Sequence, residues 1–97
     1  MNIKLQEYNP ADLLKSEEDI IAYLKDAYDD DDPATFVIAL GDVVKMRGIG
    51  YVARETGLNQ EILHKTLSGK TRPQWDTIQR VMKSLDIHIQ AVAQASA

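Results

Sequence analysis

The sequence predicts a small all-α domain of five helices followed by a short C-terminal β-strand. Apolar residues recur every three or four positions through most of residues 17–84, which is the spacing of amphipathic helices. Ser, Asp, Asn, Gly and Pro stand where such helices should begin and end. Alternating side chains over 87–92 predict the strand. With 97 residues, the chain has the length of a single domain, 1–97, with one modest core.

Composition excludes several classes of protein. The absence of cysteine excludes disulfides, thiolate zinc sites and a catalytic thiol. No apolar run approaches the ~20 residues of a membrane span, and the N-terminus lacks a signal-peptide pattern, so we expect a cytoplasmic protein with no membrane segment. The chain has no HExxH, GxSxG or glycine-rich phosphate-loop motif, so we expect no enzyme, metal or cofactor.

The net charge of −4 is unevenly divided along the chain. Residues 1–42 carry eleven acids and three bases, whereas residues 43–97 carry four acids and eight bases. A local basic patch, rather than the charge of the whole chain, determines attraction to phosphates. The division predicts a basic half suited to nucleic acid and an acidic half suited to a basic partner. The alternative for the acidic half is a solvated surface without a partner.

Two helices are expected in the acidic half, over 17–28 and 34–47. Ser16 is the expected N-cap of the first, with acidic residues at its positive end. The four acids at 29–32 resemble a calcium loop, but the alternating oxygen ligands and the distal Glu of such a loop are absent. We therefore favour Asp32 as N-cap and Pro33 as first residue of the second helix over a metal site. Its expected core residues are Phe36, Val37, Leu40, Val43, Val44 and Met46.

Residues 50–68 show the pattern of a helix-turn-helix: a helix at 50–56, a three-residue turn, and a helix at 60–68. Gly57 suits the left-handed end of the first helix, and Asn59 is a good N-cap for the second. Leu63 and Leu67 fall on one inward face. The second helix of such a motif commonly lies in the DNA major groove. Any αα-hairpin of a small helical domain can share the pattern, so a purely structural pair is the alternative.

The outward face of the second helix is polar, which suits contacts with DNA. The side chains that we expect to read base edges are Gln60, Glu61, His64 and Lys65. Those that we expect to contact phosphates are Lys45, Arg47, Lys70, Thr71 and Arg72. Ile62 is either a core residue or a contact for a thymine methyl. For Trp75, a core position is favoured over a contact with the DNA backbone.

A last helix is expected over 74–84, followed by the strand at 87–92. A lone strand leaves backbone groups unpaired. The strand should therefore pair either with residues 3–5 or with its copy in a second subunit.

From about Pro10 to Ile89, the chain resembles the addiction-module antidote proteins, small relatives of Cro/repressor-type helix-turn-helix proteins. The resemblance lies in SEEDIIAYLKDAYDDDDPATFVIALGDVVKMRGI and VARETGLNQEILHKTLSGKTRPQWDTIQRVMKSLDI. It implies a lambda-repressor-like fold and a DNA-binding antitoxin that represses its own operon and neutralises a small basic toxin of the RelE/HigB type. Two positions depart from the family pattern. Gly50-Tyr51 replaces a common Thr-Gln, which affects the usual phosphate clamp, and Ile62 replaces a small polar residue.

The expected binding mode is a homodimer with two recognition helices in successive major grooves, about 34 Å apart, on palindromic operator DNA. One rival is a protein-binding adaptor that sequesters a toxin without binding DNA. Another is a stand-alone, phage-type transcriptional regulator.

Overall fold

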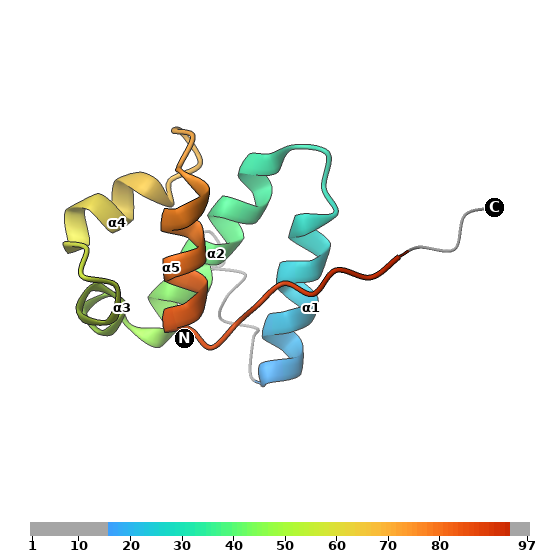
Figure 1. Cartoon of the computed structure of the whole chain (residues 1–97), viewed down its shortest axis with the longest axis horizontal. Coiled ribbons are helices and arrows are strands. Elements are labelled where there is room, and N and C mark those ends of the chain that lie inside the picture. Colours follow the sequence, from blue (N-terminus) through green and yellow to red (C-terminus); the bar gives the residue numbers. More distant parts are fainter. Residues whose placement is uncertain (1–15, 94–97) are drawn as a thin grey trace, which may run out of the picture.

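The computed structural model describes residues 16–93, which fold into five helices (Figure 1). The all-α prediction is confirmed for this part of the chain, and every predicted helix is present with ends within two residues of those expected. None of these helices is long and apolar enough to cross a lipid bilayer. The helices are α1 (Glu17–Tyr28), α2 (Pro33–Arg47), α3 (Ile49–Thr56), α4 (Gln60–Thr66) and α5 (Trp75–Ser84).

Local capping explains where the first two helices begin. The Ser16 hydroxyl accepts a hydrogen bond from the Asp19 N–H at 3.1 Å, and the Asp32 carboxylate accepts one from the Ala34 N–H at 2.9 Å. Pro33 is the first residue of α2, where its missing N–H costs nothing. Each such cap stabilises a helix by about 1 kcal/mol. The capping roles predicted for Ser16 and Asp32 are therefore confirmed.

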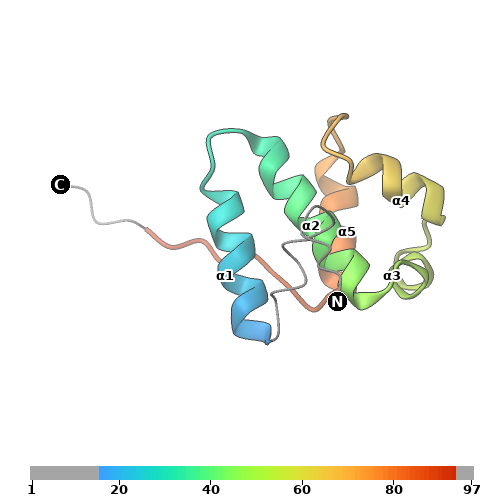
Figure 2. The same cartoon turned by 180° about the vertical axis from the view of Figure 1, so that it is seen from behind.

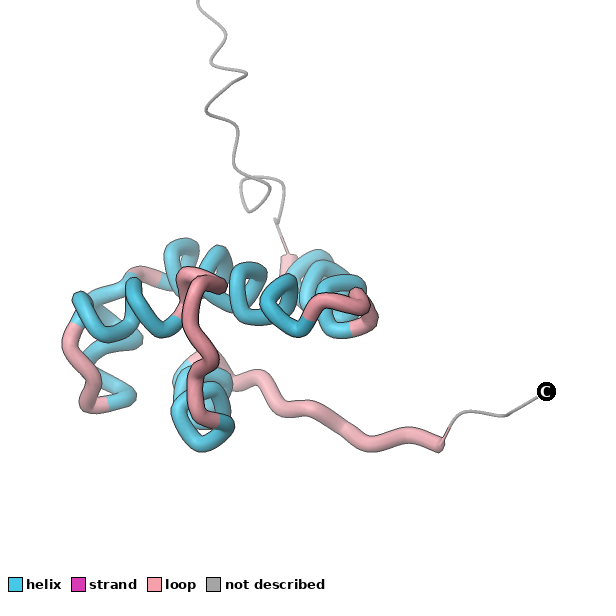
Figure 3. The backbone as a smooth tube through the Cα atoms, turned by 90° about the horizontal axis from the view of Figure 1, so that it is seen from above, coloured by secondary structure: helices cyan, strands magenta, loops and turns pink. Residues whose placement is uncertain are grey.

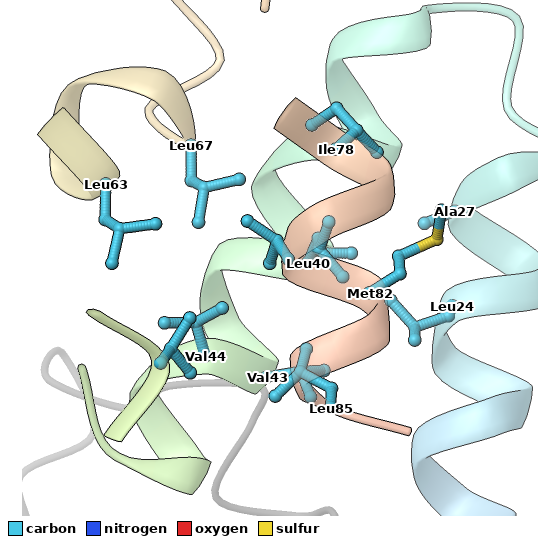
Figure 4. Packing of buried hydrophobic residues seen from close by; sticks show 13 residues of the cluster. Leu24, Ala27, Leu40, Val43, Val44, Leu63, Leu67, Ile78, Met82 and Leu85 are labelled. Atoms are coloured by element: carbon cyan, nitrogen blue, oxygen red, sulfur yellow. The ribbon is translucent and has the colours of Figure 1, made fainter. Parts of the chain in front are cut away.

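The core is shared by all five helices. α1 packs on α2, α2 on α3, and α3 on both α4 and α5. Figure 4 shows side chains from these helices meeting between α2, α4 and α5. Helices this short are marginal in water by themselves, so the shared core determines their arrangement. The buried apolar residues are Leu24, Ala27, Ala39, Leu40, Val43, Val44, Val52, Leu63, Leu67, Ile78, Val81, Met82 and Leu85.

Three large apolar side chains for which the sequence suggested a core position lie outside this core. Trp75 is 54% exposed, so the core position favoured for it is wrong. It is the first residue of α5, and the inward positions of that helix are filled further along by Ile78, Val81 and Met82. Met46, expected in the core, is 41% exposed, and Ile62 is 45% exposed.

The strand predicted over 87–92 is absent, which corrects that part of the fold prediction. After α5 the chain turns, with the Ile87 N–H donating to the Met82 carbonyl at 2.9 Å. It then runs past α1 and extends beyond the helices (Figures 1 and 3). A strand exists only when a neighbour pairs with its backbone groups, and no segment of residues 16–93 does so. One proposed partner, residues 3–5, lies outside the described residues. Pairing with a second subunit stays a prediction.

A partly buried side-chain hydrogen bond joins α1 to α2. The Tyr23 hydroxyl donates to the Asp42 carboxylate over 2.5 Å. Burial, together with this hydrogen bond and the negative charge of Asp42, raises the pKa of Tyr23 to about 12. The folded protein therefore holds this proton more tightly than the unfolded chain does.

We expect Tyr23→Phe to lower the free energy of unfolding at neutral pH by about 1 kcal/mol, because the Asp42 carboxylate loses its donor. In the wild type, this contribution is complete below the unfolded tyrosine pKa of about 10 and is lost as the pH rises toward about 12. The stability gap between wild type and variant should therefore narrow over that pH interval in urea titrations. Tyr28→Phe, at an exposed ring, is the control. A gap that stays constant with pH would contradict this linkage.

Candidate nucleic-acid interface

The turn between α3 and α4 is held by the side chain of Thr56. This buried hydroxyl donates to the Val52 carbonyl at 2.7 Å and accepts a hydrogen bond from the Leu58 N–H at 3.2 Å. Gly57 follows in the left-handed region with φ 76°, which ends α3. From α5, an Arg80 guanidinium nitrogen lies 3.4 Å from the Thr56 carbonyl. The role of Thr56 was not predictable from the sequence, because one Thr before a Gly is a weak signal.

α4 is oriented by its N-cap, Asn59, and by two leucines. The Asn59 side chain accepts a hydrogen bond from the Ile62 N–H at 2.7 Å, as predicted for an N-cap. Leu63 is fully buried and Leu67 is 8% exposed, and both point from α4 toward α2 (Figure 4). The opposite side of α4 therefore faces solvent. It carries all four predicted base-reading residues in exposed positions: Gln60, Glu61, His64 and Lys65.

The segment after α4 is tied back to the end of that helix. The Ser68 hydroxyl donates to the Lys65 carbonyl at 2.9 Å and accepts from the Lys70 N–H at 3.1 Å. The Thr71 hydroxyl lies 3.4 Å from the same carbonyl. Three predicted phosphate contacts are thus exposed beside the predicted base-reading residues. We call this set the α4 surface: Gln60, Glu61, His64, Lys65, Lys70, Thr71 and Arg72.

Two glycines allow the end of α4 to approach α2. A Cβ on Gly41 would lie 3.1 Å from the Leu67 carbonyl oxygen. Gly69 has φ 82°, and a Cβ there would lie 2.6 Å from Cγ1 of Ile38 on α2. The short distances show that the backbone around Gly69 is packed closely against α2, which positions the basic segment at 70–72.

The other two predicted phosphate contacts, Lys45 and Arg47, are exposed in the last turn of α2. The Arg47 guanidinium lies 5.6 Å from the centre of the Tyr51 ring. Arg47 also lines a cleft of about 310 Å³ between α1, α2 and the end of α5, and no residue of the α4 surface lines this cleft. Arg47 therefore lies near α1 and the end of α5 and not within the α4 surface. The contact of Lys45 and Arg47 with phosphate stays a prediction.

The structure adds Arg54 to the candidate site. A Cβ on Gly50 would lie 3.7 Å from the amide nitrogen of Gln60 and 3.9 Å from a guanidinium nitrogen of Arg54. An exposed cation of α3 and a residue of the α4 surface thus lie beside the same glycine. Arg54 and Gln60 belong to different helices, so sequence spacing alone could not associate them.

Charge is separated between the two sides of the molecule. Figures 1 and 2 show α1 and α4 on opposite sides of α5. Residues 16–32, which include α1, contain eight acids and one lysine, whereas the α4 surface contains three cations and one acid. Among residues 16–93, no His, Asp and Glu side chains are grouped so that they could hold a metal ion. The arrangement offers a polar, basic surface at α4 and an acidic one at α1.

Comparison with known proteins identifies the family of the chain. Residues 4–93 match the family described as "Probable addiction module antidote protein". The chain is also 36% identical over 90 residues to a protein of Haemophilus influenzae described as "Uncharacterized protein", with 93% of each chain covered. No solved structure matches it. Because the family match covers nearly the whole sequence, the chain belongs to the addiction module antidote protein family.

Proposed function

We propose that the protein is the DNA-binding antitoxin of a type II toxin–antitoxin module, which represses its own operon and neutralises a toxin. The observation that carries the DNA-binding part is the α4 surface. Its residues are exposed, and burial of Leu63 and Leu67 on the other side of α4 keeps them turned outward. Membership of the antidote family supports the antitoxin role.

In this proposal α3 and α4 form a lambda-repressor-like helix-turn-helix, with α4 in the major groove. Side chains near the N-terminus of a recognition helix reach base edges, which fits Gln60 and Glu61, with His64 and Lys65 one turn later. Lys70 and Arg72, beside the helix end, contact the phosphate backbone. Arg54, in the last turn of α3, joins them because its guanidinium and the Gln60 amide both lie beside Gly50.

We also propose that the protein binds its operator as a homodimer. Two copies would place their α4 helices about 34 Å apart, which matches a palindromic site. The extended segment after α5 supports association, because Ile89 is 42% exposed and Val92 is 76% exposed. A second copy would remove these side chains from water. Sedimentation of the full chain with operator DNA tests this: the wild type should have the mass of a dimer, and Ile89→Asp should have a smaller protein mass. If both proteins sedimented with the mass of one subunit, the dimer would be excluded.

Two substitutions separate base reading from phosphate binding. On DNA from upstream of its own gene, Arg72→Ala should weaken binding to all sequences and reduce the slope of log K against log[salt] by about one. Lys65→Ala should instead relax sequence preference at one position of each half-site, by about 1–3 kcal/mol. Gel shifts over a salt series measure both effects.

Lys25→Ala, on the acidic helix α1, is the matched control and should leave DNA affinity unchanged. If Arg72→Ala changed only the preferred sequence, the two roles would be reversed. If wild-type protein shifted no upstream DNA in dilute salt but co-purified with a small basic protein, the adaptor function would replace the regulator.

The acidic residues at 17–32 are proposed to contact the toxin, a small basic protein of the RelE/HigB type. Asp26, Asp29 and Asp31 are exposed, and none of their side chains caps a helix, since Asp29 ends α1 through its backbone N–H. Asp32, in contrast, caps α2 with its carboxylate, and Asp30 accepts a hydrogen bond from the Asp32 N–H at 2.8 Å. Changing the first three to Asn removes charge while leaving the caps. Co-purification with the product of an adjacent gene for a short basic protein should then decrease. Unchanged recovery would exclude this contact.

A further inference from the structure

Ile62 is an apolar side chain on the polar side of α4. It follows Gln60 and Glu61, and it lies one helical turn before Lys65 and Thr66. It is 45% exposed, although the adjacent Leu63 is fully buried. Ile62 belongs neither to the buried core nor to the partly buried apolar residues that pack against it. Its surroundings on α4 are hydrogen-bonding groups, which suit a polar partner rather than an apolar one.

Both the backbone and the side-chain rotamer of Ile62 are restricted. Its backbone N–H donates to the Asn59 side chain at 2.7 Å in the cap of α4. A β-branched side chain in a helix also keeps essentially one χ1 rotamer. The structure therefore presents a rigid apolar group in the first turn of α4. This N-terminal part of a recognition helix is the part that contacts base edges.

We infer that Ile62 reads a thymine of the operator by packing against its C5 methyl group. This inference rests on the proposed DNA-binding function. The major-groove edges of the four base pairs offer hydrogen-bond donors and acceptors, and the thymine methyl is their one apolar group. An apolar side chain among Gln60, Glu61 and Lys65 can therefore contribute sequence information only by finding that methyl. The contact selects T·A over the other base pairs at one position of each half-site.

Replacement of thymine by uracil removes only this methyl group, so any loss of affinity measures the contact with the methyl group alone. The probe is the duplex that the wild-type protein itself enriches from random-sequence DNA. Each thymine of that duplex is then changed to uracil, one position at a time, and the dissociation constant is measured for the wild type and for Ile62→Ala. We expect one position in each half-site where uracil weakens wild-type binding about four-fold, the effect of one buried methyl-sized group.

Ile62→Ala should bind the thymine and uracil duplexes equally at that position. Alanine favours helix, so the variant should keep its circular dichroism spectrum and melting temperature. Ile21→Ala, at a residue of α1 that is 44% exposed, is the matched control and should keep the four-fold preference for thymine.

The outcomes distinguish this inference from the function on which it rests. If no duplex is enriched, the proposed DNA binding fails and the inference fails with it. If a duplex is enriched and bound, but uracil has no effect at any position or the same effect on Ile62→Ala as on wild type, only the role of Ile62 is overturned.

Discussion

Leu63→Ala should lower the free energy of unfolding by about 3.5 kcal/mol, the middle of the range for truncation of buried leucines. Leu63 is fully buried and is the central inward residue of α4, a helix of seven residues. A helix of that length is unstable alone, so its attachment to the domain depends on this packing. Urea denaturation followed by circular dichroism measures the loss.

The matched control is Glu61→Ala, on the exposed side of the same helix, which should change stability by less than about 0.5 kcal/mol. Leu63→Met, which nearly conserves side-chain volume, should cost less than about 1.5 kcal/mol. If Leu63→Ala cost no more than Glu61→Ala, α4 would not be held by the core.

Gly69→Ala should cost about 2 kcal/mol, from two separable causes. Gly69 has φ 82°, and an L-residue in the left-handed region costs about 1 kcal/mol. The added Cβ would also lie 2.6 Å from Cγ1 and 2.7 Å from Cδ1 of Ile38. Because Ile38 is 47% exposed, its side chain can partly move aside, so the contact should cost about 1 kcal/mol.

Two variants separate these causes in the same urea titrations. Gly57→Ala has a similar backbone angle, φ 76°, but its new Cβ would meet nothing within 4 Å, so only the backbone cost should remain. Placing Gly69→Ala in an Ile38→Ala background should remove the contact cost. Equal losses for Gly57→Ala and Gly69→Ala would show that Ile38 yields freely.

The helices were predictable because their signals are local. Ser16, Asp32 and Asn59 each accept a hydrogen bond from an N–H two or three residues later, so the sequence nearby contains both partners. The strand at 87–92 was not predictable on the same grounds. Alternation describes which faces a strand would have, but the partner that it needs is distant in sequence or in another molecule.

The outward side of α4 was also predictable, because burial of Leu63 and Leu67 determines which residues face solvent. Features that depend on other helices were not. The exposure of Trp75 follows from where α5 begins on the domain, and the position of Arg54 and Gln60 beside the same glycine, Gly50, follows from the crossing of α3 and α4. The direction of Arg47 likewise depends on its neighbours Tyr51 and α1.

The separation of acidic α1 from the basic α4 surface gives the molecule an electric dipole moment. A polyanion exerts a torque on such a dipole before any contact forms, and the torque turns the basic end forward. Encounters with a polyanion in which α1 leads are repelled. If the protein binds DNA as proposed, a larger share of collisions therefore begins with α4 facing the DNA. This alignment weakens as salt shortens the range of the field to about 10 Å at 0.1 M.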